Sequence, residues 1–321
     1  SCENVCMSLT IGVDIGGTKI AAGLVDEDGH IVQMVRKPSP ARDTPSVIDT
    51  VVSVVSTLRD GHDIGGIGVG AAGFVNADRD RVIFAPNLAW RDEPLGDKLA
   101  NATDLPVIVE NDANAAAWGE FRFGAARGYN SAAVITVGTG IGGGIIVNGE
   151  LLRGGAGFAG EIGHMNMVSG GLPCGCGQRG CWEVYSSGGA LLRAARENAR
   201  TDRERSANML DLAGGDPELI TGLLVTQAAQ AGCAGALDAF REVGRWLGQG
   251  MADLGALLDP EVFVLAGGVS EAGCVLLEPA RENYEQRLTA YAHRPIAPVV
   301  LASLGNDAGI IGAADLARNV N

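Results

Sequence analysis

Residues 9–35 read LTIGVDIGGTKIAAGLVDEDGHIVQMV, and residues 132–154 read AAVITVGTGIGGGIIVNGELLRG. Both stretches have the same order: an apolar strand, a glycine turn, a second strand, a polar turn and a third strand. Each is followed later by another apolar strand that ends in small residues, IGGIGVGAAG at 64–73 and EVFVLAGG at 261–268. This duplication predicts two similar α/β domains, each with a glycine turn after its first strand.

Two common nucleotide sites are excluded, one by the strand that follows the second glycine turn and the other by the spacing of the first turn. Residues 138–143 satisfy G-x-G-x-x-G, but a dinucleotide fingerprint needs a helix next. GGTK at 16–19 lacks the spacing of a P-loop. Either turn alone would be an ordinary tight β-turn. Because the turn occurs twice, we expect its backbone N–H groups and the hydroxyls of Thr18 and Thr139 to bind phosphate.

A second candidate follows the strand PVIVE, which ends at Glu110 and is followed by Asn111, Asp112 and a strongly helix-forming stretch. Asp112 is therefore expected at the carboxyl end of a strand, where α/β proteins place ligands. Two roles stay open: the cap of the following helix, or a proton acceptor that the helix N-terminus keeps ionised.

The third candidate is a loop with one histidine and three cysteines. His164, Cys174, Cys176 and Cys181 have the spacing H-x9-C-x-C-x4-C. Four nitrogen and sulfur ligands with no spare position describe a structural zinc site, and ordinary reduced thiols are the alternative.

Two carboxylates, Glu161 and Glu183, flank that loop. A zinc ion that orders the loop would also fix where they point. The alternative is that both are solvated surface acids.

Composition narrows the class of protein. A chain of 321 residues suffices for two domains, and a net charge of −14 argues against nucleic acid or an anionic membrane as the main partner. The longest apolar run, 132–147, is broken by threonine and glycine, so no membrane span is expected. No secretion signal is recognised, and Cys2, Cys6, Cys233 and Cys274 have the spacing of free thiols. We expect a cytoplasmic enzyme.

The segments DIGGTK at 14–19, Gly160–His164 and Cys174–Glu183 together resemble the signature of the ROK family of bacterial repressors, open reading frames and sugar kinases. The resemblance extends from Leu9 to the C-terminus, and within the family it points to actinobacterial-type glucokinases. It implies the two-domain actin-like (sugar kinase/ribonuclease H-like) ATPase fold. The implied reaction is ATP-dependent phosphorylation of the 6-hydroxyl of glucose, a step of glycolysis, with Mg²⁺ and a structural Zn²⁺.

The resemblance also implies domain limits and residue roles. A small domain would span 8–118 and include the C-terminal helix 306–318, and a larger domain would span 119–305 and carry the zinc loop 161–183. Asp112 would be the catalytic base, and His164 would bind zinc by one ring nitrogen and the sugar by the other. The implied sugar-binding residues are Gly73, Asn87, Asn111, Asp112, Glu161, His164 and Glu183. The implied residues for ATP and its magnesium are Asp14, Gly16, Gly17, Thr18, Lys19, Gly138, Thr139, Gly140, Gly142, Gly143, Gly267 and Gly268.

Several alternatives remain. The same motifs suit a kinase for N-acetylmannosamine, N-acetylglucosamine or fructose, and polyphosphate could replace ATP as donor. A sugar-sensing repressor would need an N-terminal DNA-binding domain of on the order of 60–80 residues. The first glycine turn begins near residue 14, which leaves no room for such a domain before it, so a repressor is not expected. A binding protein without activity is disfavoured by the presence of both Asp14 and Asp112. A homodimer or homotetramer is expected because relatives form them.

Overall fold

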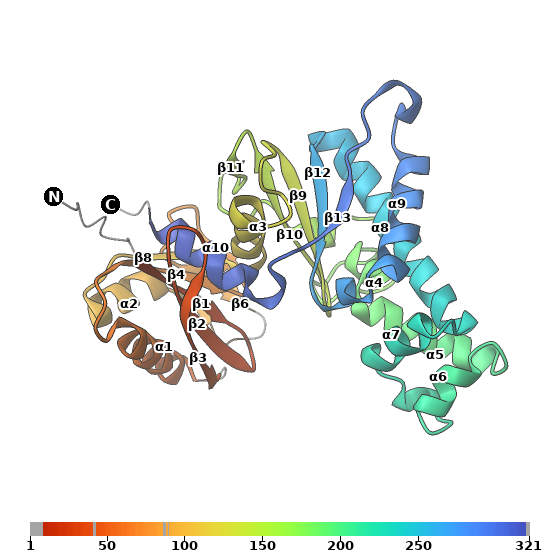
Figure 1. Cartoon of the computed structure of the whole chain (residues 1–321), viewed down its shortest axis with the longest axis horizontal. Coiled ribbons are helices and arrows are strands. Elements are labelled where there is room, and N and C mark those ends of the chain that lie inside the picture. Colours follow the sequence, from red (N-terminus) through yellow and green to blue (C-terminus); the bar gives the residue numbers. More distant parts are fainter. Residues whose placement is uncertain (1–8, 41–42, 86–87, 89, 319–321) are drawn as a thin grey trace. The chain divides into compact units, whose positions relative to one another are not determined.

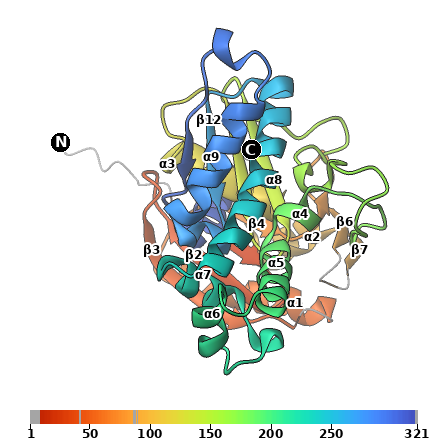
Figure 2. The same cartoon turned by 90° about the vertical axis from the view of Figure 1, so that its right-hand side faces the viewer.

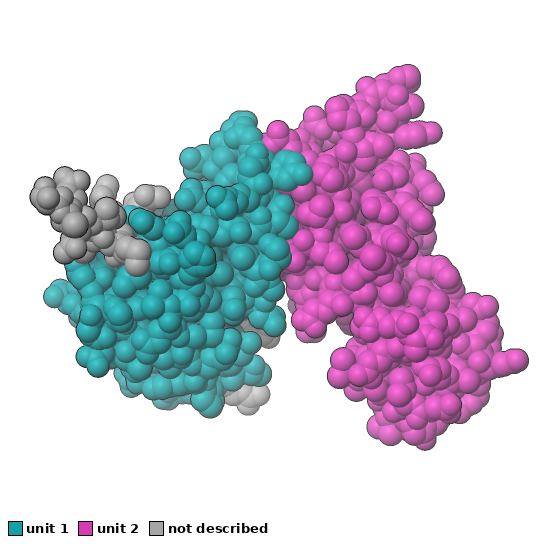
Figure 3. Space-filling view, viewed as in Figure 1, with its two compact units in different colours: residues 1–130, 144–160, 303–321 teal, residues 131–143, 161–302 magenta. Residues whose placement is uncertain are grey.

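The computed structural model describes residues 9–40, 43–85, 88 and 90–318 (Figure 1). The chain forms two compact units (Figure 3). Unit 1 comprises 1–130, 144–160 and 303–321, and unit 2 comprises 131–143 and 161–302. The domain limits expected from the sequence, 8–118 with 306–318 and then 119–305, stay a prediction, because compact units need not coincide with domains.

Unit 1 is built on a five-stranded sheet with the order β3-β2-β1-β4-β8. Its strands are β1 (Leu9–Ile15), β2 (Lys19–Val25), β3 (Ile31–Pro38), β4 (Ile64–Ala71) and β8 (Val107–Asn111). β1 and β2 are antiparallel, whereas β4 is parallel to both β1 and β8. The carboxyl ends of β1, β4 and β8 therefore share one edge, the edge at which parallel sheets bind ligands.

Helices cover both faces of this sheet (Figure 1). One face packs against α1 (Thr44–Arg59) and α2 (Leu95–Thr103), whose buried leucines and valines share a core with the strands. The other face packs against α10 (Ala308–Ala317), which also lies along α3 (Asp112–Phe123). A Cβ on Gly68 would lie 1.7 Å from the carbonyl oxygen of Ala313, so only glycine permits this close approach of helix to strand. A small sheet, β5 (Phe74–Val75), β6 (Val82–Ala85) and β7 (Trp90–Glu93), follows β4.

A second five-stranded sheet has the order β11-β10-β9-β12-β13. Its strands are β9 (Ala132–Val137), β10 (Ile141–Val147), β11 (Glu150–Leu151), β12 (Val262–Ala266) and β13 (Val299–Leu301). β12 is parallel to β9 and β13. Both sheets therefore place their strands in the order third, second, first, fourth, fifth, and the duplicated α/β fold predicted from the sequence is confirmed.

The helices of unit 2 are α4 (Glu183–Ser186), α5 (Gly188–Thr201), α6 (Ala207–Leu212), α7 (Gly222–Gln230), α8 (Ala234–Leu258) and α9 (Cys274–Arg287). α8 and α9 lie side by side (Figures 1 and 2). The Trp182 side chain is fully buried against Gly250 of α8, and its Nε1–H donates to the Trp246 carbonyl oxygen at 2.7 Å. Trp182 directly follows Cys181, so it anchors the end of the cysteine loop on the longest helix of the unit.

Candidate active site and metal centre

Two carboxylates lie at the ligand-binding edge of the first sheet. Asp14 pairs in register with Gly70 of β4, and Asn111, the residue before Asp112, pairs with Ala71. A Cβ on Gly70 would lie 3.7 Å from the Asp112 Cα atom. The sheet topology thus brings together two acids that are 98 positions apart in the sequence.

Both carboxyl groups hold their protons more tightly than free aspartate does. Burial, and then repulsion from Asp112, raise the pKa of Asp14 from 3.8 to about 6, while Lys19 opposes the change. Burial also raises the pKa of Asp112, although hydrogen bonds from backbone N–H groups, that of Ala113 among them at 2.9 Å, partly offset it. A carboxylate with a raised pKa is a stronger base at neutral pH, so Asp112 is suited to accept a proton.

Asn111, rather than Asp112, caps the helix that follows. The Asn111 Oδ1 atom accepts the Asn114 backbone N–H at 3.0 Å, and Asp112 is the first residue of α3. The capping role considered for Asp112 is therefore wrong, because the helix begins one residue earlier than that role requires. The Asn111 Nδ2–H donates to the carbonyl oxygen of Gly73 at 3.1 Å, which joins two predicted sugar-binding residues. Asn87, a third, lies outside the described residues.

The first glycine turn joins β1 to β2. The Gly16 backbone N–H donates to the Lys19 carbonyl oxygen at 3.0 Å, and Gly17, Thr18 and Lys19 are exposed. The turn therefore leaves its tip free for a ligand, as phosphate binding requires.

The second glycine turn joins β9 to β10 and borders a cavity of about 580 Å³ in unit 2. Three predicted nucleotide-binding residues, Gly138, Thr139 and Gly268, line the cavity, whereas Gly140, Gly142, Gly143 and Gly267 are not part of its wall. The remaining lining residues are Gly188, Gly189, Leu191, Leu192, Gly222, Leu223, Thr226, Val269 and Glu271.

The sequence reasoning missed this other wall of the cavity. Ser187 caps α5 through the Ala190 backbone N–H, and Gly188 and Gly189 are the first two residues of that helix. The run Ser-Ser-Gly-Gly at 186–189 was the available signal, because serine before glycines marks a helix start with accessible N–H groups.

The cysteine loop brings its four predicted metal ligands together. One ligand atom each from His164, Cys174, Cys176 and Cys181 lies within 4.8 Å of all the others. The Cys176 and Cys181 sulfurs are 3.7 Å apart, and the His164 Nδ1 atom is 3.7 Å from the Cys174 sulfur. A tetrahedral zinc ion with Zn–S bonds of about 2.3 Å separates its ligands by about 3.8 Å. The donor set and its spacing therefore fit zinc.

The three glycines between the thiols differ in whether the backbone requires glycine at their positions. Gly177 and Gly180 have φ angles of +91° and +84°, which favour glycine, and a Cβ on Gly180 would lie 1.8 Å from the Val168 carbonyl oxygen. Gly175 has an ordinary φ and open space around it. Two of the three glycines between the thiols are thus required by the backbone.

The two ring nitrogens of His164 face different groups. Nδ1 points to the cysteines, while Nε2 lies 3.9 Å from the Glu161 carboxylate. Glu183 accepts a hydrogen bond from the Cys174 thiol at 2.9 Å, and its other oxygen lies against Gly140. His164, Glu161 and Glu183 are consequently collected beside the cysteine cluster and the second glycine turn.

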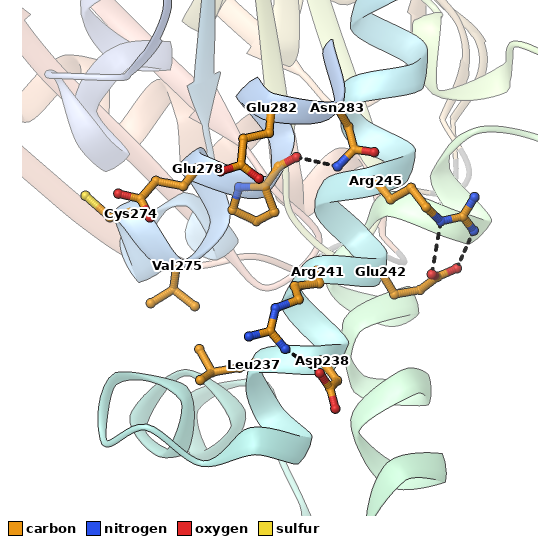
Figure 4. A pocket seen from close by; sticks show the side chains of 11 residues that line it. Leu237, Asp238, Arg241, Glu242, Arg245, Cys274, Val275, Glu278, Glu282 and Asn283 are labelled. Carbon is orange, nitrogen blue, oxygen red and sulfur yellow. Dashed lines mark hydrogen bonds and ion pairs between the residues drawn. The ribbon is translucent and has the colours of Figure 1, made fainter. Parts of the chain in front are cut away.

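A further hollow of about 580 Å³ lies between α8 and α9 (Figure 4). Its two cations are already paired with acids of the same helix, Arg241 with Asp238 and Arg245 with Glu242. Glu278 and Glu282 add two acids from α9. Of the expected sugar, nucleotide and zinc residues that the structure describes, none lines this hollow, so it is not the candidate site.

Among the described residues, no helix is both long enough and apolar enough to span a bilayer.

Comparisons with known proteins agree with this architecture. The model of the ROK family matches residues 10–320. A glucokinase of Streptomyces coelicolor is 51% identical over 97% of this chain and 98% of its own length. The crystal structure of a ROK family glucokinase from Streptomyces griseus, in complex with glucose and AMPPNP, superposes with a TM-score of 0.87 at 49% identity, covering 97% and 99% of the two chains. An N-acetylmannosamine kinase of Escherichia coli is 34% identical over 96% of this chain and 98% of its own length. The chain belongs to the ROK family.

Proposed function

We propose that this chain is a glucokinase that transfers the γ-phosphoryl group of ATP to the 6-hydroxyl of glucose. The observation that carries the proposal is the pair of half-buried acids with raised pKa values at the ends of β1 and β8, Asp14 and Asp112. The relatives named glucokinase, one of them with glucose and an ATP analogue bound, support the same reaction.

Asp112 is the proposed general base. Its carboxylate accepts the proton of the 6-hydroxyl while the hydroxyl oxygen attacks the γ-phosphorus, and the bond from that phosphorus to the bridging oxygen breaks to release ADP. The Asn111 side chain caps α3 and so stabilises the first helical turn, which contains Asp112. The raised pKa of Asp112 makes it a better proton acceptor at neutral pH than an exposed aspartate would be.

Nucleotide binding is assigned to both glycine turns. The turn at 16–19 would hold phosphate oxygens through its exposed N–H groups and the Thr18 hydroxyl. The cavity beside Gly138 would hold the nucleoside, with Leu191, Leu192 and Leu223 as its apolar wall. Asp14 would orient the magnesium ion of Mg-ATP through water, and that ion would supply neutralisation of the phosphate charge.

Zinc is the metal proposed for the cysteine cluster. Zinc would order the loop and thereby set the direction of the His164 ring, whose Nε2 is then free for a sugar hydroxyl. Glu161 and Glu183 would accept hydrogen bonds from neighbouring hydroxyls. The zinc would take no part in the transfer itself.

The test is an ADP-release assay with Mg-ATP and four sugars: glucose, N-acetylmannosamine, N-acetylglucosamine and fructose. We expect the highest kcat/KM with glucose. A higher kcat/KM with N-acetylmannosamine would favour the second candidate, for which the 34% identical kinase of that substrate is the specific support. An absence of ADP release with every sugar would refute the enzyme. The same assay with polyphosphate in place of ATP tests which phosphoryl donor the enzyme uses. The cytoplasmic location and the homodimeric or homotetrameric state stay predictions.

A further inference from the structure

Glu110 is a buried acid that the proposed reaction does not use. It is the penultimate residue of β8, two positions before Asp112, and only 3% of it is exposed. Burying a carboxylate costs free energy unless each oxygen finds partners. Both oxygens of Glu110 do so: Oε1 contacts two asparagines, and Oε2 contacts two arginines.

The Glu110 Oε1 atom holds the strand-to-helix junction. It accepts the Asn111 backbone N–H at 3.1 Å and the Asn114 Nδ2–H at 3.1 Å. Asn111 and Asn114 are themselves joined by the helix cap. Oε1 is thus hydrogen-bonded to Asn111 before Asp112 and to Asn114 after it. A shift of this oxygen would therefore move the backbone that carries the Asp112 carboxylate.

The Glu110 Oε2 atom holds two arginines. It lies 2.8 Å from Arg153 Nε and 3.2 Å from Arg79 Nε. Arg79 is also fixed through its backbone, because its carbonyl oxygen accepts the Val109 N–H at 2.8 Å. Arg153 comes from a different part of the chain, after β11.

Arg153 stands at the base of a loop. Its carbonyl oxygen accepts the Ala159 N–H at 3.0 Å and closes the segment 153–159. Within that loop Gly157 has a φ of +93°, and a Cβ there would lie 2.5 Å from the Val75 carbonyl oxygen, so the loop is seated tightly on β5. The chain continues from this loop directly into Glu161, a proposed sugar-binding residue.

Stability alone is a weak reason for this arrangement. Buried ion pairs often contribute no more than well-packed apolar residues of similar volume, because both charges lose their hydration. An ion pair does impose a defined geometry on the elements it joins. Here those elements are the strand end that carries the candidate base and the loop that leads to a sugar-binding residue.

We infer that Glu110 is a positioning residue for Asn111 and Asp112. We also infer that its ion pair with Arg153 fixes the position of the loop 153–160 relative to the end of β8. The inference rests on the proposed function, since it concerns the geometry of that reaction. Loss of the pair would leave Mg-ATP binding unchanged and would weaken glucose binding and turnover together.

The experiment compares Glu110→Gln, Arg153→Gln, Arg153→Lys and the double variant Glu110→Gln/Arg153→Gln by steady-state kinetics, with calorimetric titration of glucose. Each single Gln variant should lower kcat/KM for glucose by about tenfold to a hundredfold, with KM for Mg-ATP within about twofold of wild type. Arg153→Lys should recover part of the loss because it restores the cation. The double variant should be no worse than the poorer single variant, since both changes break one interaction.

Glu120→Gln is the matched control. Glu120 is a fully buried acid of α3 that accepts the backbone N–H groups of Ala125, Ser303 and Leu304 and none from Asn111 or Asn114. We expect it to lower the unfolding temperature and to keep kcat/KM for glucose within about twofold.

Three results would overturn the inference: unchanged kinetics in folded Glu110→Gln or Arg153→Gln, losses that simply add in the double variant, or an equal kinetic loss in Glu120→Gln. If Glu110→Gln does not fold, the two Arg153 variants decide, because Arg79 still pairs with Glu110 in them. A wild-type protein that does not phosphorylate glucose would refute the proposed function instead.

Discussion

The two five-stranded sheets have the same strand order, yet they carry different groups at the carboxyl ends of their parallel strands. In the first sheet, Asp14 lies two residues before the glycine turn and Asp112 follows the last strand. In the second sheet, the corresponding positions hold Thr136 and Ala302. The scaffold is thus duplicated but the acids are not, so the first sheet carries the proposed chemistry.

The second sheet is specialised in another way. Unit 2, which holds β9, β12 and β13 of that sheet, contains the cavity beside Gly138 and the loop with the cysteine cluster, and unit 1 has no matching loop among its described residues. In the proposed reaction, the acids therefore come from the first copy of the fold, whereas both copies contribute binding residues. Substitutions at matched positions of the two sheets test this division.

The largest difference is expected at Asp112. Replacing Asp112 by Asn removes the proposed base and should lower kcat by about 10²-fold to 10⁴-fold, while the variant stays folded. Steady-state kinetics would measure the loss of kcat, and circular dichroism would check that the variant is folded. Near-normal turnover in the folded variant would contradict the assignment of the base.

Asp14→Asn should lower kcat by about a hundredfold, because the variant loses the charge that is proposed to orient the magnesium ion of the nucleotide. Its counterpart in the second sheet is Thr136→Val, a change of similar size without charge, and it should retain most activity. Equal losses in the two variants would remove the distinction between the sheets.

Asp14→Asn should also change the dependence of stability on pH. The pKa of Asp14 is about 6 in the folded protein, against an ordinary value of 3.8, so the folded state keeps this proton between about pH 4 and 6. The free energy of unfolding of the wild type therefore falls as pH rises through that window. The free energy of unfolding of the variant should not show this fall, because the variant lacks the titrating carboxyl group. Above pH 6 we expect the variant to be more stable by on the order of 2–3 kcal/mol, and near pH 3 the two should match. Urea unfolding without magnesium or nucleotide would measure it, and a variant less stable than wild type at pH 8 would contradict the prediction.

The cysteine cluster tests the binding role of unit 2. Cys176→Ser removes one proposed zinc ligand and should reduce the zinc content below one ion per chain. It should also raise KM for glucose by about tenfold to a hundredfold without a similar rise in KM for Mg-ATP. Metal analysis and kinetics check this, with the exposed Cys274→Ser as control. Full activity in a zinc-free variant would exclude a role for the metal in the sugar site.

The smallest effect is expected at Gly140. A Cβ there would lie 2.5 Å from Glu183 Oε2, so Gly140→Ala should displace that flexible carboxylate and raise KM for glucose by roughly fivefold. Gly175→Ala is the control, because no atom lies within 4 Å of its added Cβ. Equal KM values in the two variants would mean that Glu183 does not contact the sugar.

The sequence by itself determined the duplicated fold, both glycine turns and the grouping of the four zinc-type ligands. These features are local: the alternation of apolar strands, the conformational needs of turns and short ligand spacings are all visible within about thirty residues. The same local view placed Asp112 at the end of a strand.

Only the tertiary structure decided which neighbours these residues have. It assigned the helix cap to Asn111 instead of Asp112, brought Asp14 beside Asp112, and added Gly188 and Gly189 to the wall of the cavity. It also buried Glu110 against Arg153, which is 43 positions away. Such pairings follow from strand register and from the packing of distant segments, and no local pattern of residues encodes either.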